Sequence, residues 1–307
     1  MKILLTGATG FIGRPLLRLL REEGHEVTAV SHTAEKAKRL RIEGVDVVRF
    51  DLTHHRLSTD VVKHCEAVIH LAGSSPESGD SDHCSRLDLI GTEHLLEAVS
   101  RAPVSRFIHI SCTAVMGDHG GEWVTEAMPP APQTPHGQAK LQAEELILNA
   151  HQIWRLPAVI LRMAHVYGPG SLFGQIVEQM QEGRVALPRR VLQAQWGLIS
   201  LHDAVRAIHH ALTHGRTGEI YFVADGKSQT VKETLTHVAK ALDLPHPTQA
   251  GLIHRWRGDR GVLHALSASA RPRIDKMKTE MHFRPEHRSL EEGLLAVMKG
   301  PGAAKSH

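Results

Sequence analysis

Three glycines near the start of the chain are spaced as a phosphate-binding turn requires. They lie within Thr6–Gly13, between a short apolar run and an amphipathic segment. Gly7 would permit a tight turn, Gly10 would let the backbone approach a pyrophosphate, and Gly13 would let a helix pack closely on a strand. The N-terminus of that helix would offer N–H groups and a partial positive charge to the phosphates. The motif therefore predicts a dinucleotide site.

The choice between NAD and NADP depends on the end of the second expected strand. A carboxylate about 20 residues past the glycine turn would hydrogen-bond the 2′-hydroxyl of the adenosine ribose. Ser31 and His32 stand there instead, and Arg14, Lys36 and Arg39 are further cations nearby. Because no acid would repel a 2′-phosphate, the sequence favours NADP over NAD. Lys36 and Arg39 are also what the solvated face of a helix would carry.

These residues need a scaffold, and the first half of the chain predicts one. Short runs rich in Val, Ile and Leu alternate with longer amphipathic segments, which is typical of a doubly wound parallel α/β sheet of the Rossmann type. We expect strands at 2–6, 26–31, 45–49, 66–71, 105–111 and 157–162. We expect helices at 11–23, 34–43, 85–101 and 136–151.

Beyond residue 163 the alternation becomes irregular, which indicates a smaller lobe. Strands are expected at 196–200 and 219–223, and helices near 203–213 and 229–242. The predicted domains are an NAD(P)-binding Rossmann domain (1–170), a small C-terminal substrate-binding lobe that takes most of 171–298 but returns some segments to the main sheet, and a flexible tail (299–307).

The sequence resembles the extended short-chain dehydrogenases, the group of NAD-dependent sugar epimerases and dehydratases, over nearly its whole length. Besides the three glycines, the resemblance is carried by Asp51-Leu52, His70-Leu71-Ala72-Gly73, Gly91–Ala98, Leu161-Arg162 with Val166–Gly170, and Phe283-Arg284-Pro285 with Ser289–Leu294. It implies that Asp51 and Leu52 lie beside the adenine and that Leu71, Ala72 and Gly73 line the ribose and diphosphate. The expected cofactor-binding residues are Gly7, Gly10, Phe11, Ile12, Gly13, Arg14, Ser31, His32, Lys36, Asp51, Leu52, Leu71, Ala72, Gly73 and Lys140.

In that family a Tyr handles the reacting hydroxyl, with a Lys four residues later on the same helical face and a Ser or Thr at the end of the fifth strand. Here Lys140 is in place, His136 replaces the Tyr and Cys112 replaces the Ser or Thr. Imidazole titrates near neutrality without help, so His136 is a plausible acid and base, although it reaches less far than a phenol. A thiol is a weak hydrogen-bond donor. Ser111 and Thr113 flank Cys112, and strand alternation would turn them away unless the strand bends at its end.

Two interpretations follow from these replacements. The chain is either an NAD(P)-dependent oxidoreductase or epimerase that uses His136, Lys140 and Cys112, or an NAD(P)-binding structural or regulatory protein that has lost proton transfer. The resemblance implies a nucleotide sugar or another small carbonyl or alcohol as substrate. Dehydration is disfavoured because Thr113-Ala114 supply no acidic pair.

Composition restricts the other classes of function. The formal charge of +3 is too small to favour nucleic acid, and no apolar run approaches the roughly 18 residues of a membrane span. Cys65, Cys84 and Cys112 are widely spaced, which indicates neither a disulfide framework nor a thiolate zinc site and favours the cytoplasm. Histidine pairs such as His54-His55 lack metal-binding spacing, so no metal is expected.

Three features of the surface and the second half of the chain are more ambiguous. Pro188-Arg189-Arg190 and Arg255-Trp256-Arg257 could grip a diphosphate or belong to exposed loops, and Asp203 is expected to cap or brace a helix. Helices 85–101 and 136–151 could pair in a homodimer. Their charged residues indicate one largely polar side and are Arg86, Glu93, Glu97, Glu144 and Glu145.

Overall fold

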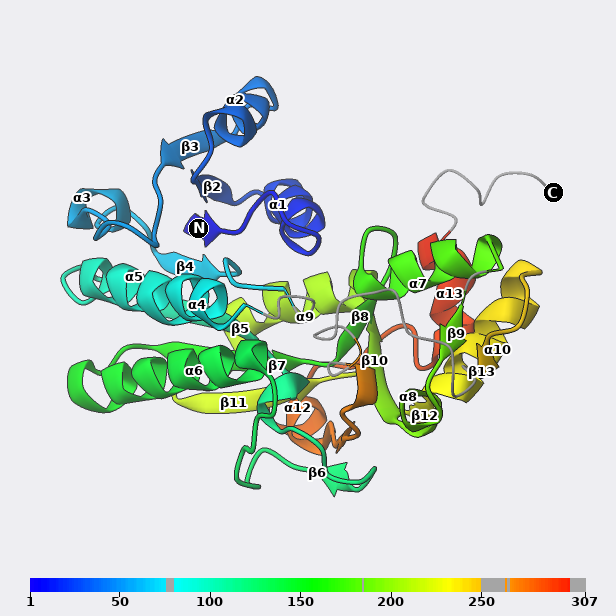
Figure 1. The fold of residues 1–307 in the computed structure, drawn as a ribbon. Helices are drawn as coiled ribbons and strands as arrows, with labels where there is room; N and C mark the ends of the chain where they lie inside the picture. Colours follow the sequence, from blue (N-terminus) through cyan, green and yellow to red (C-terminus); the bar gives the residue numbers. More distant parts are fainter. Residues whose placement is uncertain (76–79, 184, 250–262, 264–265, 299–307) are drawn as a thin grey trace.

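The computed structural model describes residues 1–75, 80–183, 185–249, 263 and 266–298. Its centre is a seven-stranded parallel sheet in the order β11-β7-β5-β4-β1-β2-β3 (Figure 1). The strands are β1 (Lys2–Thr6), β2 (Glu26–Ser31), β3 (Asp46–Arg49), β4 (Ala67–His70), β5 (Arg106–Cys112), β7 (Ala158–Met163) and β11 (Glu219–Val223). The order reverses beside β1, so the sheet is doubly wound and the predicted fold class is confirmed.

Helices cover both faces of this sheet because successive strand residues point to opposite faces. The face with Ile3 and Leu5 is covered by α1 (Gly13–Glu22), α2 (Ala34–Ile42) and α9 (Leu201–His214). The face with Leu4 is covered by α3 (Thr59–Val62), α5 (Gly91–Val99) and α6 (Pro135–Trp154). The central strands β4 and β7 are therefore buried along their whole length, whereas the edge strand β3 is only partly buried.

The predicted helix at 85–101 is the one element that the structure changes substantially. It begins earlier, as α4 (Ser81–Cys84), and continues through a π-helical segment, η1 (Ser85–Ile90), before α5. Such π-turns are common at functional sites because they re-aim a side chain. Here the turn carries Asp88, which is buried.

The smaller lobe is built around a three-stranded sheet in the order β12-β10-β8, seen at the right of Figure 1. Its strands are β8 (His165–Tyr167), β10 (Gln195–Ser200) and β12 (Ser228–Thr230), packed with α7 (Leu172–Gln181), α8 (Arg189–Gln193), α10 (Val231–Leu242) and α13 (Leu290–Met298). The remaining elements are η2 (Thr113–Val115), α12 (Asp275–Thr279), and the short pairs β6 (Trp123–Val124) with β14 (Arg271–Pro272) and β9 (Ala186–Leu187) with β13 (Thr248–Gln249).

Within the described ranges, no helix is both long and apolar enough to cross a membrane. The predicted tail 299–307 lies outside the described residues. Asp203 braces the start of α9, as expected: it is buried and accepts hydrogen bonds from the backbone N–H groups of Glu286 and His287, while Ser200 is the N-cap.

One charged residue that we placed on the polar side of a helix is in fact buried. Glu144 of α6 accepts from the guanidinium of Arg162 on β7, with Nε–Oε1 at 3.0 Å and Nη2–Oε2 at 2.7 Å. This two-pronged pair ties α6 to the sheet and is fully shielded from water. A buried pair of this kind is costly to break because one charge is left without a partner.

We predict that Arg162→Met lowers the free energy of unfolding by about 3–5 kcal/mol, because it leaves the Glu144 carboxylate buried and unpaired. The double change Arg162→Met/Glu144→Leu should recover most of that loss, since an apolar pair needs no desolvation of charge. Urea unfolding followed by circular dichroism measures both. Equal losses in the single and double variants would contradict this account.

Candidate active site

The glycine turn has the geometry of a dinucleotide phosphate site. Gly7 adopts a φ of +72°, and a Cβ there would lie 2.8 Å from the backbone N of Ala72. A Cβ on Gly13 would overlap the carbonyl oxygen of Gly7. No side chain caps the N-terminus of α1, which begins at Gly13. The turn therefore brings backbone and a helix N-terminus to one point without side chains in the way, which fits a pyrophosphate.

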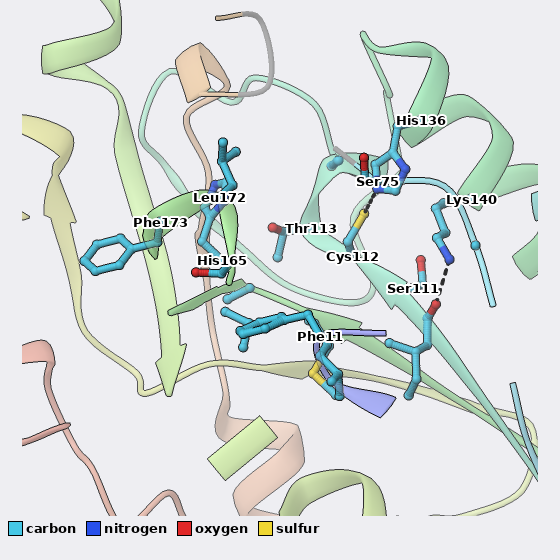
Figure 2. Close-up of a pocket in the computed structure, with 18 of the residues that line it drawn as sticks. Phe11, Ser75, Ser111, Cys112, Thr113, His136, Lys140, His165, Leu172 and Phe173 are labelled. Carbon is cyan, nitrogen blue, oxygen red and sulfur yellow. Dashed lines mark hydrogen bonds between the residues drawn. The ribbon is translucent and has the colours of Figure 1, made fainter. Parts of the chain in front are cut away.

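A pocket of about 730 Å³ extends from this turn to the smaller lobe. Its wall passes from Gly10 and Phe11, past Cys112 and His136, to Leu172 and other residues of the lobe. Figure 2 shows these side chains arranged around one hollow, with Phe11 below and the Cys112–His136 pair opposite His165 and Leu172. A cofactor seated on the glycine turn would thus share a cavity with the expected catalytic residues.

A buried ion pair anchors the catalytic end of the pocket. Lys140 Nζ lies 2.9 Å from Asp88 Oδ1 and donates to the carbonyl of Ile110 at 3.0 Å. Both side chains are almost fully buried. Burial opposes ionisation of Asp88, but the Lys140 ammonium and hydrogen bonds from Ser74 and Lys140 lower its pKa overall. A Cβ on Gly73 would collide with both partners, so the pair needs glycine there.

Asp88 reaches His136 through Ser74. The backbone N–H of Ser74 donates to Asp88 Oδ2 at 3.1 Å, and the Ser74 hydroxyl also makes a short contact with this oxygen. Ser74 Oγ lies 2.7 Å from His136 Nδ1. An ionised carboxylate only accepts, so the single hydroxyl proton points to Asp88 and Ser74 must accept from Nδ1–H. Neutral His136 therefore carries its proton on Nδ1 and a lone pair on Nε2.

The Nε2 atom of His136 faces Cys112, whose Sγ lies 3.2 Å away (Figure 2). Burial raises the pKa of the Cys112 thiol to about 11, so the sulfur is protonated and donates to Nε2. Burial, followed by the Lys140 ammonium, lowers the pKa of His136 to about 4, although Asp88 opposes this. At neutral pH His136 is a neutral imidazole with its accepting nitrogen at the pocket.

The end of β5 does bend, which was the condition for its neighbouring residues to reach the pocket. The strand ends at Cys112 and turns directly into η2, so that Ser111, Cys112 and Thr113 all border the cavity. In Figure 2 the Thr113 side chain lies in the hollow between Cys112 and His165. A hydroxyl, that of Thr113, therefore borders the pocket beside Cys112.

A second histidine fixes the strand ends beneath the site. His70 Nδ1 lies 2.7 Å from Thr6 Oγ1, and its Nε2 lies 3.0 Å from Thr92 Oγ1. Thr92 donates to the carbonyl of Asp88, and Thr6 accepts from the N–H of Ala72, so the two hydroxyls assign the proton of His70 to Nε2. Burial lowers the pKa of His70 to about 3, which keeps this link neutral.

At the expected adenosine end, two of the cations that we placed near a 2′-phosphate already have partners within the protein. Arg14 pairs with Glu43 and Arg39 pairs with Glu35, so two of the expected cations are already engaged. Ser31 is buried, and Asp51 accepts from Thr53 in a local turn. The preference for NADP, the cofactor that carries a 2′-phosphate, over NAD therefore stays a prediction.

The structure gathers some of the expected site residues and leaves others apart. Those at the pocket are Gly7, Gly10, Phe11, Ile12, Gly13, Leu71, Gly73, Cys112, His136 and Lys140. Those away from its wall are Arg14, Ser31, His32, Lys36, Asp51, Leu52 and Ala72. Sequence reasoning missed Ser74 and Asp88, whose signal was their position beside His70–Gly73 and Gly91. The described residues contain no group of three or more His, Cys, Asp or Glu arranged to hold a metal.

Comparisons with known proteins identify the family of the chain. The model of the NAD dependent epimerase/dehydratase family matches residues 3–224. The chain is 31% identical over 330 residues to a dTDP-glucose 4,6-dehydratase of Streptomyces niveus, covering 97% of this chain and 92% of that protein. It is 27% identical to a 3-diazoavenalumate denitrifying reductase of a Streptomyces species, covering 96% and 99%. The structure of a UDP-glucuronic acid 4-epimerase from Bacillus cereus with NAD matches with a TM-score of 0.79 at 26% identity, covering 96% and 94%.

We predict that His136 stays neutral, as the Nδ1–H tautomer, well below its usual titration range, and gains a proton only near pH 4. Nitrogen NMR of histidine-labelled protein reports both the tautomer and the titration. Asp88→Asn should lower the pKa of His136 further, because the carboxylate favours the imidazolium. The exposed change Ser100→Ala should leave the signal unchanged, whereas an Nε2–H tautomer in the unmodified protein would contradict the assignment.

Proposed function

The chain belongs to the NAD dependent epimerase/dehydratase family, and from this we propose that it binds NAD(P) and works as an oxidoreductase or epimerase on a nucleotide sugar or another small carbonyl or alcohol. His136 takes the role of acid and base that a tyrosine holds in the related enzymes. The relatives include a dehydratase, a reductase and an epimerase, so the family leaves the type of reaction open. The proposal therefore depends on the site itself.

One observation carries it: His136 Nε2 accepts from the Cys112 thiol at the wall of a pocket that is continuous with the glycine turn. The nicotinamide of a bound cofactor supplies hydride transfer. What the protein must add is a group that takes a proton from the alcohol, or returns one to the carbonyl. A neutral imidazole with its proton fixed on the far nitrogen is such a group.

The proton follows a defined route. A substrate hydroxyl that replaces the Cys112 thiol as donor to His136 Nε2 would transfer its proton there as the alcohol is oxidised. The imidazolium that forms keeps its Nδ1–H bond to Ser74, which remains bonded to the Asp88 carboxylate. Asp88 thus stabilises the charged ring without taking the proton. In the reverse direction Nε2–H protonates the carbonyl oxygen.

Lys140 and Thr113 position the reactants. An ammonium has three donors, and Lys140 uses two of them on Asp88 and Ile110. The third is free to hold a cofactor ribose hydroxyl at the pocket. The Thr113 hydroxyl, which borders the same cavity, can donate to the substrate oxygen in place of the weaker Cys112 thiol.

For the cofactor, we retain NADP as slightly favoured over NAD. The related epimerase structure contains NAD. Against this, no carboxylate follows β2, where Ser31 and His32 stand, and Lys36 lies exposed in the first turn of α2. The competing function is an NAD(P)-binding protein without turnover, which the buried, weakly basic state of His136 would suit.

We predict that calorimetric titration detects binding of NADPH and of NADH, with NADPH the tighter. The double change Lys140→Ala/Asp88→Asn should weaken the affinity for both nucleotides by about tenfold, because a hydrogen bond from a charged group is lost. The double change is preferred because Lys140→Ala alone would leave Asp88 buried and unpaired. Lys63→Ala, which breaks an exposed pair with Asp60, is the matched control. Absence of binding by either nucleotide would remove the proposal.

We predict turnover that depends on His136 and Ser74. Oxidation of NADPH would be followed by absorbance with acetophenone and with UDP-4-keto sugars as probes. His136→Ala should slow it by about 100-fold or more. Ser74→Ala should slow it by about tenfold, because the imidazolium that protonates the carbonyl oxygen loses its link through Ser74 to the Asp88 carboxylate.

Because the pKa of His136 is lowered to about 4, the rate of alcohol oxidation should stay level from neutral pH down to about pH 5 and fall below it as Nε2 gains a proton. Ser100→Ala is the control for Ser74→Ala. If the protein binds cofactor but turns over neither class of probe, and His136→Ala binds cofactor equally well, the result would instead support the alternative, an NAD(P)-binding protein without turnover.

A further inference from the structure

We propose that the substrate is an uncharged ketone or secondary alcohol that carries a flat aromatic or conjugated group, and that it is not a nucleoside diphosphate sugar. This names the substrate class for the site described above, and it rests on the proposed function. It selects between the two substrate classes that the family resemblance leaves open.

The charge of the pocket wall is the first argument. Among the described residues that border the cavity, Lys140 is the one Lys or Arg, and no Asp or Glu is present. Lys140 is already paired with Asp88. The histidines of the wall are neutral as well, because burial lowers the pKa of His165 and of His136 to about 4 each. The described wall therefore offers no net charge to a substrate.

The shape of the lobe side is the second argument. His165 stacks at a tilt against Trp196, with ring centroids 4.8 Å apart. The Trp196 indole N–H donates to the carbonyl of Leu266 at 3.1 Å, which holds the ring in place. Leu172 and Ile176 of α7 complete this side of the pocket. An aromatic group stacks well on such a wall, and Figure 2 shows Leu172 and His165 facing the Cys112–His136 pair.

The remaining polar groups of the lobe side are neutral amides and hydroxyls. They include Gln175 and Gln195, and Gln195 already accepts from the hydroxyl of Ser228 at 3.4 Å. Groups of this kind orient a carbonyl or hydroxyl, as in most small-molecule sites. They offer no cation to the diphosphate of a nucleotide sugar, whose charge would lose part of its hydration in the pocket.

Two other features could attract a diphosphate. The N-terminus of α7 borders the pocket, and its cap Ser171 accepts the N–H of Gly174, which satisfies one of the N–H groups at this helix start. Arg190 pairs with Asp118, and neither it nor Arg189 is part of the pocket wall. The cations expected at Arg255 and Arg257 lie outside the described residues. The balance of the described wall favours the uncharged substrate.

The test is a binding measurement on protein saturated with NADPH, so that it does not depend on turnover. The probes are 2-acetylnaphthalene for the aromatic ketone and UDP-glucose for the nucleotide sugar, each titrated by ligand-observed NMR. We expect 2-acetylnaphthalene to bind at least about tenfold more tightly than UDP-glucose. Leu172→Arg places a cation on the wall. It should weaken binding of the ketone by about tenfold or more and strengthen binding of UDP-glucose.

Ile153→Arg, at an exposed position of α6, is the matched control and should change neither affinity. Tighter binding of UDP-glucose than of the ketone would overturn the proposal, as would failure of the ketone to bind. These results are distinct from failure of the proposed function, which would appear earlier as failure of NADPH itself to bind.

Discussion

The buried ion pair between Lys140 and Asp88 is the interaction on which the site depends. Two charges removed from water need further hydrogen bonds beside their own pairing, and here the carbonyl of Ile110 accepts from Lys140 while Ser74 donates to Asp88. The ionised state of Asp88 then dictates the rest, because a carboxylate can only accept. The Ser74 proton points to Asp88, and the His136 proton points to Ser74. The His136 ring, which we propose as the base, is thus oriented by a charge that lies two hydrogen bonds away.

The same pair resolves an electrostatic problem created by the histidine. An ammonium beside a phenol favours its ionised form and makes it a better base, whereas beside an imidazole it disfavours the protonated form. Lys140 alone would therefore work against His136, and it does lower the pKa of that ring. Asp88 offsets part of this effect while leaving Lys140 able to bind. Asp88, His136 and Lys140 therefore act on one another electrostatically, and changing the type of one changes what the other two can do.

The sequence predicts the parts of this design that are local. The glycine turn, the parallel strands and the position of Lys140 four residues after His136 follow from spacing along the chain. Ser74 and Asp88 could not be found in this way, because they meet His136 only when the ends of β4, the π-turn and α6 come together. The π-turn has no reliable sequence signal. Glu144 was misassigned for a similar reason, since its partner Arg162 lies on another element.

The neutral pocket and the relay behind His136 suit the same chemistry. Oxidising an alcohol to a ketone with hydride transfer moves one proton to the base and leaves the substrate uncharged throughout. In the proposed reaction the positive charge would appear on His136, in a buried place where it needs a compensating charge. Asp88, linked to His136 Nδ1 through Ser74, would provide that negative charge on the side of the ring away from the substrate. The substrate side of the pocket then needs no carboxylate. A pocket wall with no Asp or Glu among its described residues is what this division of roles predicts, and it also leaves the reaction open to substrates that bind through apolar contact.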